Sequence, residues 1–92
     1  MAGTPTGVNV ARLRAVDRPE VVSAFLGARV DVTVQWGQTA EQRTELHGRA
    51  VAVASVFGEP GVMVLVLHAD DGRTWALKLT RLARIARAEG GR

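Results

Sequence analysis

Residues 29–36 read RVDVTVQW, and this strict alternation of apolar and polar side chains is the strongest constraint on the fold. Successive side chains of a β-strand point to opposite faces of its sheet. Val30, Val32, Val34 and Trp36 therefore share one face, and their polar neighbours share the other. The alternation predicts a strand with one buried face and one face in water.

Three further segments have the character of strands. Residues 45–57 carry small side chains in a long run, which indicates sharp curvature or a close approach of neighbouring backbone. Residues 62–67 are apolar at every position, so this strand is expected to be central in the sheet or covered by a partner. Residues 74–79 place Trp75 and Leu77 on one face. The small residues of the long strand are Gly48, Ala50, Ala52 and Ala54.

The residues Asp70-Asp71-Gly72 separate two of these strands. Asp-Gly between two apolar runs is a strong hairpin signal, because the turn needs a residue with positive φ. Two adjacent carboxylates at a hairpin tip point apart, whereas a general acid and base must face one reacting centre. The pair is therefore interpreted as part of a turn and not as a catalytic site.

A short helix is expected before the first long strand. Asp17 and Glu20 have the spacing of a capping box, and Pro19 lies in the first turn, where its missing N–H costs nothing. Gly27 is placed to end the helix. These signals predict a helix over residues 18–26.

The segment after Leu79 has two interpretations. Thr80 and Gly90 have the positions of an N-cap and a C-terminal glycine of a short helix, which would place Arg81, Arg84 and Arg87 on a common side. Alternatively, a tight turn at residues 80–82 leads into a last strand through Ile85. For residues 80–86 we favour the second interpretation, a turn followed by a strand, because a barrel needs a closing strand.

The chain has 92 residues, enough for one small domain with a modest core. Residues 1–7 are expected to form a flexible leader, residues 8–86 the domain, and residues 87–92 a basic tail. The chain has no cysteine, no apolar run of about 20 residues and no signal-peptide pattern. The expectation is a soluble protein without membrane contact, located in the cytoplasm, or in a virion if the host is viral.

Side chains for catalysis or metal binding are few. His47 and His68 have no third or fourth ligand at a metal-binding spacing. Ser23 and Ser55 are placed on a helix and a strand, with no strained turn to expose a nucleophile. We therefore expect no enzymatic activity, no metal and no cofactor.

The stretch LGARVDVTVQWG…LHGRAVAV, within residues 26–53, resembles the first sequence motif of the Sm-like proteins. The residues that carry the resemblance are Leu26, Val30, Val32, Val34, Gly37 and Gly48. The resemblance to Sm-like and SH3-like proteins implies a mainly β fold: a small, strongly bent antiparallel β-barrel of about five strands with one short N-terminal helix. The family's RNA pocket is not carried over, since Ala54, Ser55 and Phe57 replace its polar residues and LTRLARI lacks its Arg-Gly pair.

Charge is unevenly distributed along the chain. Residues 73–92 carry six cationic side chains against Glu89, whereas residues 19–72 carry seven carboxylates against three arginines. Basic ends on an acidic body suit an anionic partner or a neighbouring copy of the chain. The candidate contacts to nucleic acid or another anion are Arg81, Arg84, Arg87, Lys78, Arg12 and Arg14. Trp36 and Trp75 continue the apolar phase of their strands and are interpreted as core residues rather than stacking platforms for bases.

Two functions are compatible with these features. The first is a structural module that associates with itself or docks in a larger assembly, because a strand that is apolar on both faces exceeds what a small core can bury. The residues proposed for this association are Val62, Met63, Val64, Leu65, Val66 and Leu67. The alternative is a barrel that binds the phosphate backbone of nucleic acid through its arginine-rich C-terminal segment.

Overall fold

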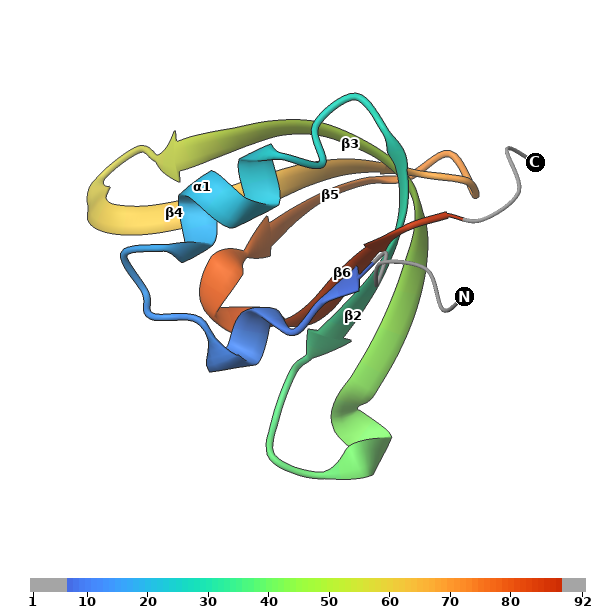
Figure 1. Cartoon of the computed structure of the whole chain (residues 1–92), viewed down its shortest axis with the longest axis horizontal. Helices are drawn as coiled ribbons and strands as arrows, with labels where there is room; N and C mark the ends of the chain where they lie inside the picture. The colour runs from blue at the N-terminus through green and yellow to red at the C-terminus, as the bar shows by residue number, and fades with distance from the viewer. Residues whose placement is uncertain (1–6, 89–92) are drawn as a thin grey trace, which may run out of the picture.

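The computed structural model describes residues 7–88, which form one antiparallel sheet of six strands with a short helix packed against it (Figure 1). The strands are β1 (Gly7–Val8), β2 (Arg29–Gln35), β3 (Arg43–Val56), β4 (Glu59–Ala69), β5 (Thr74–Lys78) and β6 (Leu82–Arg87). The helices are α1 (Arg18–Ser23) and the 3-10 helices η1 (Val10–Arg12), η2 (Ala40–Gln42) and η3 (Leu79–Arg81). The mainly β fold predicted from the sequence is confirmed.

The strands follow the order β1-β6-β2-β3-β4-β5 in the sheet. Within residues 7–88 no pairing between β1 and β5 closes the sheet, so a closed barrel is not confirmed. The sheet has one strand more than the five or so expected. The additional strand, β1, pairs only Gly7 with Ala86 and Val8 with Ile85. A strand of two residues is too short to show an alternation of apolar and polar side chains in the sequence. Of the leader expected over residues 1–7, only Gly7 lies within the described residues.

The sheet is strongly curled. The register between β3 and β4 shifts between Ala50 and Ala52, which bends the long strand β3 as β-bulges do. Trp36 follows β2, and Trp75 lies in β5, which is separated from β2 by the two strands β3 and β4, yet their ring centroids are 6.3 Å apart. The curl therefore brings the edge strand β5 opposite the end of β2.

The concave side of this sheet holds the core. Val30, Val32 and Val34 are completely buried, as the alternation in β2 predicts. The helix side supplies Val22 from α1 and Phe25 just after it. The other buried residues of the core are Val10, Ala50, Leu65, Leu67, Leu77, Leu79, Leu82 and Ile85. None of the helices in the described part of the chain is long and apolar enough to cross a membrane.

The helix α1 is shorter than the predicted span of residues 18–26, and its N-terminus is built differently. Asp17 has αR backbone angles instead of the extended angles of a capping residue, and its side chain makes no capping hydrogen bond. The carboxylate instead accepts a hydrogen bond of 2.9 Å from Arg14 Nε. The prediction of a capping box at Asp17 is therefore wrong. Gly27 follows the helix with φ +87°, which confirms the prediction that the chain leaves the helical conformation there.

The turn at Asp70-Asp71-Gly72 is confirmed. Gly72 has φ +91°, which favours glycine because it lacks a Cβ atom. Asp71 Oδ1 accepts a hydrogen bond of 2.9 Å from the backbone N–H of Arg73. Asp70 Oδ2 accepts one of 2.7 Å from Arg29 Nη2. Both carboxylates thus stabilise the turn and its neighbours.

The C-terminal segment follows the preferred interpretation. Residues 79–81 form the short turn of η3, and β6 then runs as a strand between β1 and β2. Thr80 lies inside η3 and does not cap a helix. Arg87 is the last residue of β6, and residues 89–92 of the expected basic tail lie outside the described residues.

Candidate functional site

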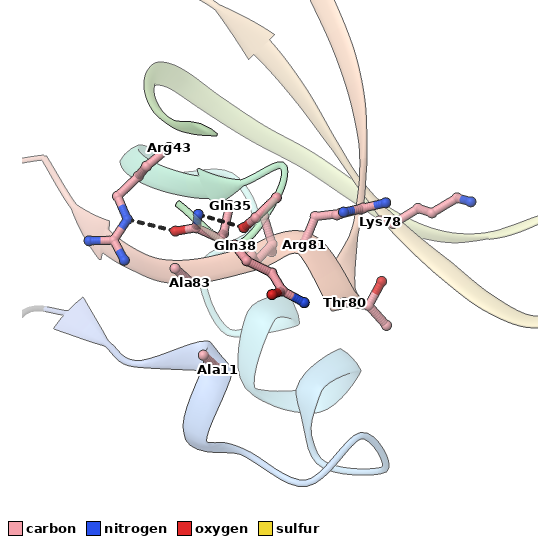
Figure 2. A pocket seen from close by; sticks show the side chains of 10 residues that line it. Ala11, Gln35, Gln38, Arg43, Lys78, Thr80, Arg81 and Ala83 are labelled. Atoms are coloured by element: carbon pink, nitrogen blue, oxygen red, sulfur yellow. Dashed lines mark hydrogen bonds between the residues drawn. The ribbon is translucent and has the colours of Figure 1, made fainter. Parts of the chain in front are cut away.

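A groove with a cavity of about 560 Å³ lies between η3, the start of β6 and the connection from β2 to β3 (Figure 2). Three cationic side chains line it, Arg43, Lys78 and Arg81, and none of its described lining residues is a carboxylate. The remaining lining residues are Ala11, Gln35, Gly37, Gln38, Thr80, Leu82 and Ala83. We call this surface the basic groove.

Hydrogen bonds hold one wall of the basic groove. Arg43 begins β3 directly opposite Gln35, the last residue of β2, and its Nε donates to Gln35 Oε1 at 2.8 Å. Gln35 Nε2 in turn donates to the carbonyl oxygens of Gly37 at 2.6 Å and Thr39 at 2.8 Å. The guanidinium of Arg43 is thereby oriented, while four of its five N–H donors stay free of partners among residues 7–88.

The opposite wall comes from the end of β5 and from η3. Arg81 Nη1 donates a hydrogen bond of 2.6 Å to the carbonyl oxygen of Trp36, which ties η3 to the end of β2. Lys78 Nζ lies 3.9 Å from Glu59 Oε1, a weak pair of two half-exposed side chains. Two of the cations predicted from sequence, Lys78 and Arg81, are thus brought together.

The other predicted cations are dispersed. Arg84, together with Arg43, lines an adjoining hollow of about 260 Å³, so it extends the basic groove. Arg87 points away from it: Nη2 donates to the carbonyl oxygen of Ala24 at 3.2 Å, and Cζ lies 5.4 Å from the centroid of the Phe25 ring. Arg87 therefore serves the packing of α1 and is separated from the basic groove.

Two of the predicted cations precede α1. Arg14 is paired with Asp17, and Arg12 is exposed in η1. The cations expected from the sequence do not include Arg43, which ends a polar stretch outside the alternating segments and begins β3 in the structure. The sequence signal for Arg43 is its position: a hairpin that follows residues 29–36 would place Arg43 opposite Gln35.

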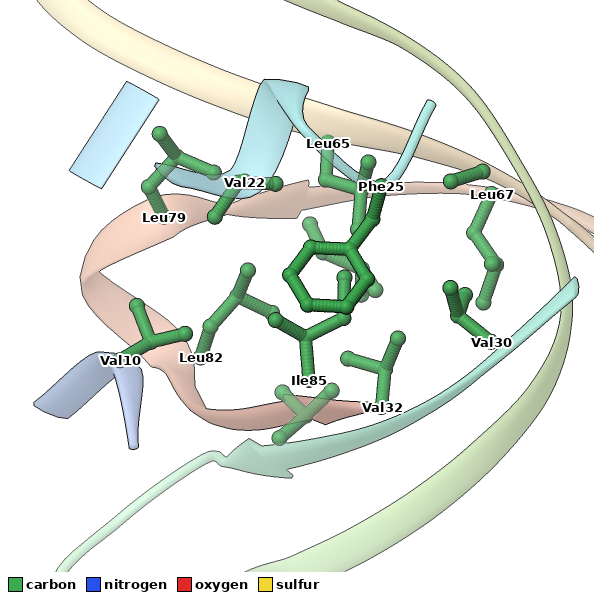
Figure 3. Packing of buried hydrophobic residues seen from close by; sticks show 13 residues of the cluster. Val10, Val22, Phe25, Val30, Val32, Leu65, Leu67, Leu79, Leu82 and Ile85 are labelled. Atoms are coloured by element: carbon green, nitrogen blue, oxygen red, sulfur yellow. The ribbon is translucent and has the colours of Figure 1, made fainter. Parts of the chain in front are cut away.

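The strand predicted to mediate association, residues 62–67, divides between two faces. Leu65 and Leu67 are completely buried and point into the core, as Figure 3 shows, and Met63 packs against it. Val62, Val64 and Val66 face the convex side, where Val64 is 8% exposed and the other two are partly exposed. Three of the six candidate residues are thus engaged inside the chain and three are directed outward.

The outward valines are flanked by small side chains. Val64 lies opposite Ala54 in β3 and Lys78 in β5, and Val66 lies opposite Ala52 and Ala76. We define the outer strip as Val62, Val64, Val66, Ala52, Ala54 and Ala76. The strip borders the edge strand β5, which has a partner strand only in β4 among the described residues.

Several large apolar side chains of the described residues are exposed outside both the core and the outer strip. Phe57, in the turn between β3 and β4, is fully exposed, and Val51 in β3 is 42% exposed. Trp75 packs against the core as predicted, whereas Trp36 remains 40% exposed.

The histidines have no metal site around them. Within residues 7–88 no three His, Cys, Asp or Glu side chains are grouped as metal ligands would be. His47 Nδ1 lies 2.8 Å from Asp31 Oδ1, and this hydrogen bond raises the pKa of His47 above its ordinary value. The pair joins two neighbouring strands on the polar face of the sheet.

Comparison with protein-family models, with curated proteins and with solved structures gave no match for this chain. The fold that is established is a mainly β chain with one antiparallel sheet of six strands. The arguments on function therefore rest on the basic groove, the outer strip and the exposed Phe57.

Proposed function

We propose that this protein is a non-catalytic structural module that associates with copies of itself through the outer strip. The observation that carries the proposal is the second apolar face of β4, which continues beside the edge strand β5, where residues 7–88 supply no further partner strand. An edge with unpaired backbone groups beside an apolar face invites contact with another chain. The alanines on both sides of Val64 and Val66 allow such a chain to approach closely.

The helix cannot cover this face in the same chain. Val22 and Phe25 pack into the core on the concave side, whereas the outer strip is on the convex side. Full burial of an exposed valine side chain contributes about 1.5 kcal/mol or more, and the partly exposed Val62 and Val66 would each contribute a fraction of this in an interface.

We infer further that the curled sheet is a small barrel of the Sm-like or SH3-like kind, left open between β1 and β5. Five strands follow α1, which is the number that the resemblance implies. The approach of Trp36 to Trp75 supports the barrel, since it requires a curl that brings non-neighbouring strands together.

The first test replaces two outward residues, as Val62→Glu/Val66→Glu. The wild-type protein is expected to have a mass in solution above that of the 9.8 kDa chain, and the variant is expected to have the monomer mass. A charge in a dry interface opposes association, but on a solvated face it is tolerated. Size-exclusion chromatography with light scattering measures both masses, and circular dichroism checks the fold.

Leu26→Glu/Gln38→Glu is the matched control, because it also introduces two carboxylates at exposed positions and both lie outside the outer strip. This control should keep the wild-type mass. A wild-type protein that is monomeric at every concentration, or a folded double variant with the wild-type mass, would show the proposal to be wrong.

A second candidate function is favoured by the basic groove: we propose binding of the phosphate backbone of nucleic acid. Guanidinium groups match phosphate oxygens in geometry, and Arg43 and Arg81 each keep donors that no other residue of 7–88 occupies. Arg84 beside the groove would meet a further phosphate. Such contacts supply affinity without reading the base sequence.

The test of this second candidate compares Arg43→Gln/Arg81→Gln with Arg14→Gln/Arg73→Gln. Both variants lose two charges, but Arg14 and Arg73 are paired with Asp17 and Asp71 outside the groove. For a labelled single strand of about 20 nucleotides, the groove variant should flatten the plot of log affinity against log salt by about 1.4 units. Equal effects of the two variants, or no binding by the wild type at low salt, would remove the groove from the function.

A further inference from the structure

A second hollow, of about 250 Å³, lies beside the start of β4. Its walls come from Ala15 and the first turn of α1, from the first residues of β4, and from the end of β5 with η3. We call it the β4 hollow. Its main lining residues are Ala15, Arg18, Pro19, Val62, Met63 and Leu79.

Phe57 is the most exposed large apolar side chain of the described residues. It occupies the two-residue turn between β3 and β4 with Gly58, whose φ of +81° fits such a turn. The ring is fully exposed, so the fold gains nothing from it. An aromatic ring held at the tip of a hairpin is suited to enter a cavity of another molecule.

We propose that Phe57 of one copy inserts into the β4 hollow of a second copy. The inference rests on the proposed self-association and names the contact that drives it. The size fits, because a cavity of about 150 Å³ in a protein core is known to take a benzene ring. The β4 hollow is larger and has Pro19, Met63 and Leu79 in its walls.

The cations of the β4 hollow favour an aromatic occupant. Arg18 and Lys78 line the hollow, and its described lining includes no carboxylate. Lys78 lies 3.9 Å from Glu59 Oε1 of its own chain, so Arg18 is the main cation offered to a ring. A cation near an aromatic ring is attracted to its face, which favours the ring of Phe57 beside Arg18. In a single copy, Arg18 donates only to the carbonyl oxygens of Leu13 and Ala11 within residues 7–88.

The positions of ring and hollow suit a two-fold dimer. Gly61 and Val62 line the hollow only a few residues after Phe57, so both features lie near the same hairpin. In a dimer with a two-fold axis, Phe57 of each copy would occupy the β4 hollow of the other. Both contacts would then be satisfied within the dimer, and no further copies would be added. Val62 also belongs to the outer strip, so the two contacts form one continuous interface.

The chain has no cysteine, which allows site-specific cross-linking. Glu59→Cys protein, which keeps the ring of Phe57 and carries its thiol two residues away, is mixed with Ala15→Cys protein and treated with a short bis-maleimide. A mixed cross-linked dimer is the expected product, identified by its mass. Glu59→Cys mixed with Gln38→Cys is the control, because Gln38 lines the basic groove instead of the β4 hollow, and it should give little mixed dimer.

Two substitutions test the same contact without a cross-linker. Phe57→Ser removes the ring and Ala15→Trp fills the hollow, and each should raise the dissociation constant of the dimer by at least about tenfold. Combining them should add little, since each abolishes the same contact. Phe57→Ser should keep the wild-type melting temperature, because the ring is fully exposed in one copy.

The outcomes separate this inference from the proposed function. A wild-type dimer that survives both substitutions, without the mixed cross-link, would overturn the insertion of Phe57 while self-association stands. A monomeric wild type would overturn self-association and the inference together.

Discussion

Gly48→Ala is expected to lower the free energy of unfolding by about 1–3 kcal/mol, as overpacking of a tightly filled site does. A Cβ atom at this position would overlap the carbonyl oxygen of His68 and lie 2.7 Å from Ala69 Cα. Both are backbone atoms of β4, so relief requires a shift of one strand against the other. Gly48 pairs directly with Ala69, and that pairing would be the first to separate. Urea denaturation measures the loss, which at about 4–8 °C per kcal/mol is also visible in the melting temperature.

Gly37→Ala is the matched control for this prediction. The added Cβ would overlap only the side-chain amide of Gln42, which can rotate away. The cost is the loss of the hydrogen bonds from Thr39 to Gln42 Oε1, on the exposed loop before β3. Equal denaturation midpoints for the two variants would contradict the close approach of β3 and β4 at Gly48.

The strand pattern was predictable where one face is buried and the other is in water. The alternation in β2 placed Val30, Val32 and Val34 in the core correctly, because burial of one face leaves a period of two in the sequence. The small residues of β3 indicated a close approach, which the structure has at Gly48. The open edge between β1 and β5 and the bulge after Ala50 leave no comparable period, since both depend on how distant segments pair.

The candidate site was predictable only in part, for a geometric reason. Arg81, Arg84 and Arg87 are spaced by three, which places them on one side of a helix but on alternating faces of a strand. Because β6 is a strand, Arg84 faces the hollow beside the basic groove whereas Arg87 reaches Phe25. Arg43 is placed in the groove by the pairing of β2 with β3. The arginine-rich C-terminal segment gives no information on that pairing.

Two neighbouring residues of β4, Leu65 and Val66, should respond differently to truncation. Leu65→Ala is expected to lower the free energy of unfolding by about 2–5 kcal/mol, because Leu65 is completely buried in the core and its loss leaves a cavity. That is a large part of the stability of a chain of this length, which is of the order of 5–14 kcal/mol. Chemical denaturation at a fixed protein concentration measures the loss.

Val66→Ala removes a partly exposed side chain from the convex face, so its cost to the isolated chain should be about 1 kcal/mol or less. It should instead weaken association, because Val66 belongs to the outer strip. Denaturation midpoints measured at several protein concentrations distinguish the two effects: stability that comes from association rises with concentration, whereas core stability does not. The midpoint of Leu65→Ala should therefore keep the wild-type dependence on concentration, and that of Val66→Ala should lose part of it. The reverse assignment would mean that β4 presents Leu65 to a partner and Val66 to the core, which would invalidate the register with Ala52 and Val53 on which the outer strip depends.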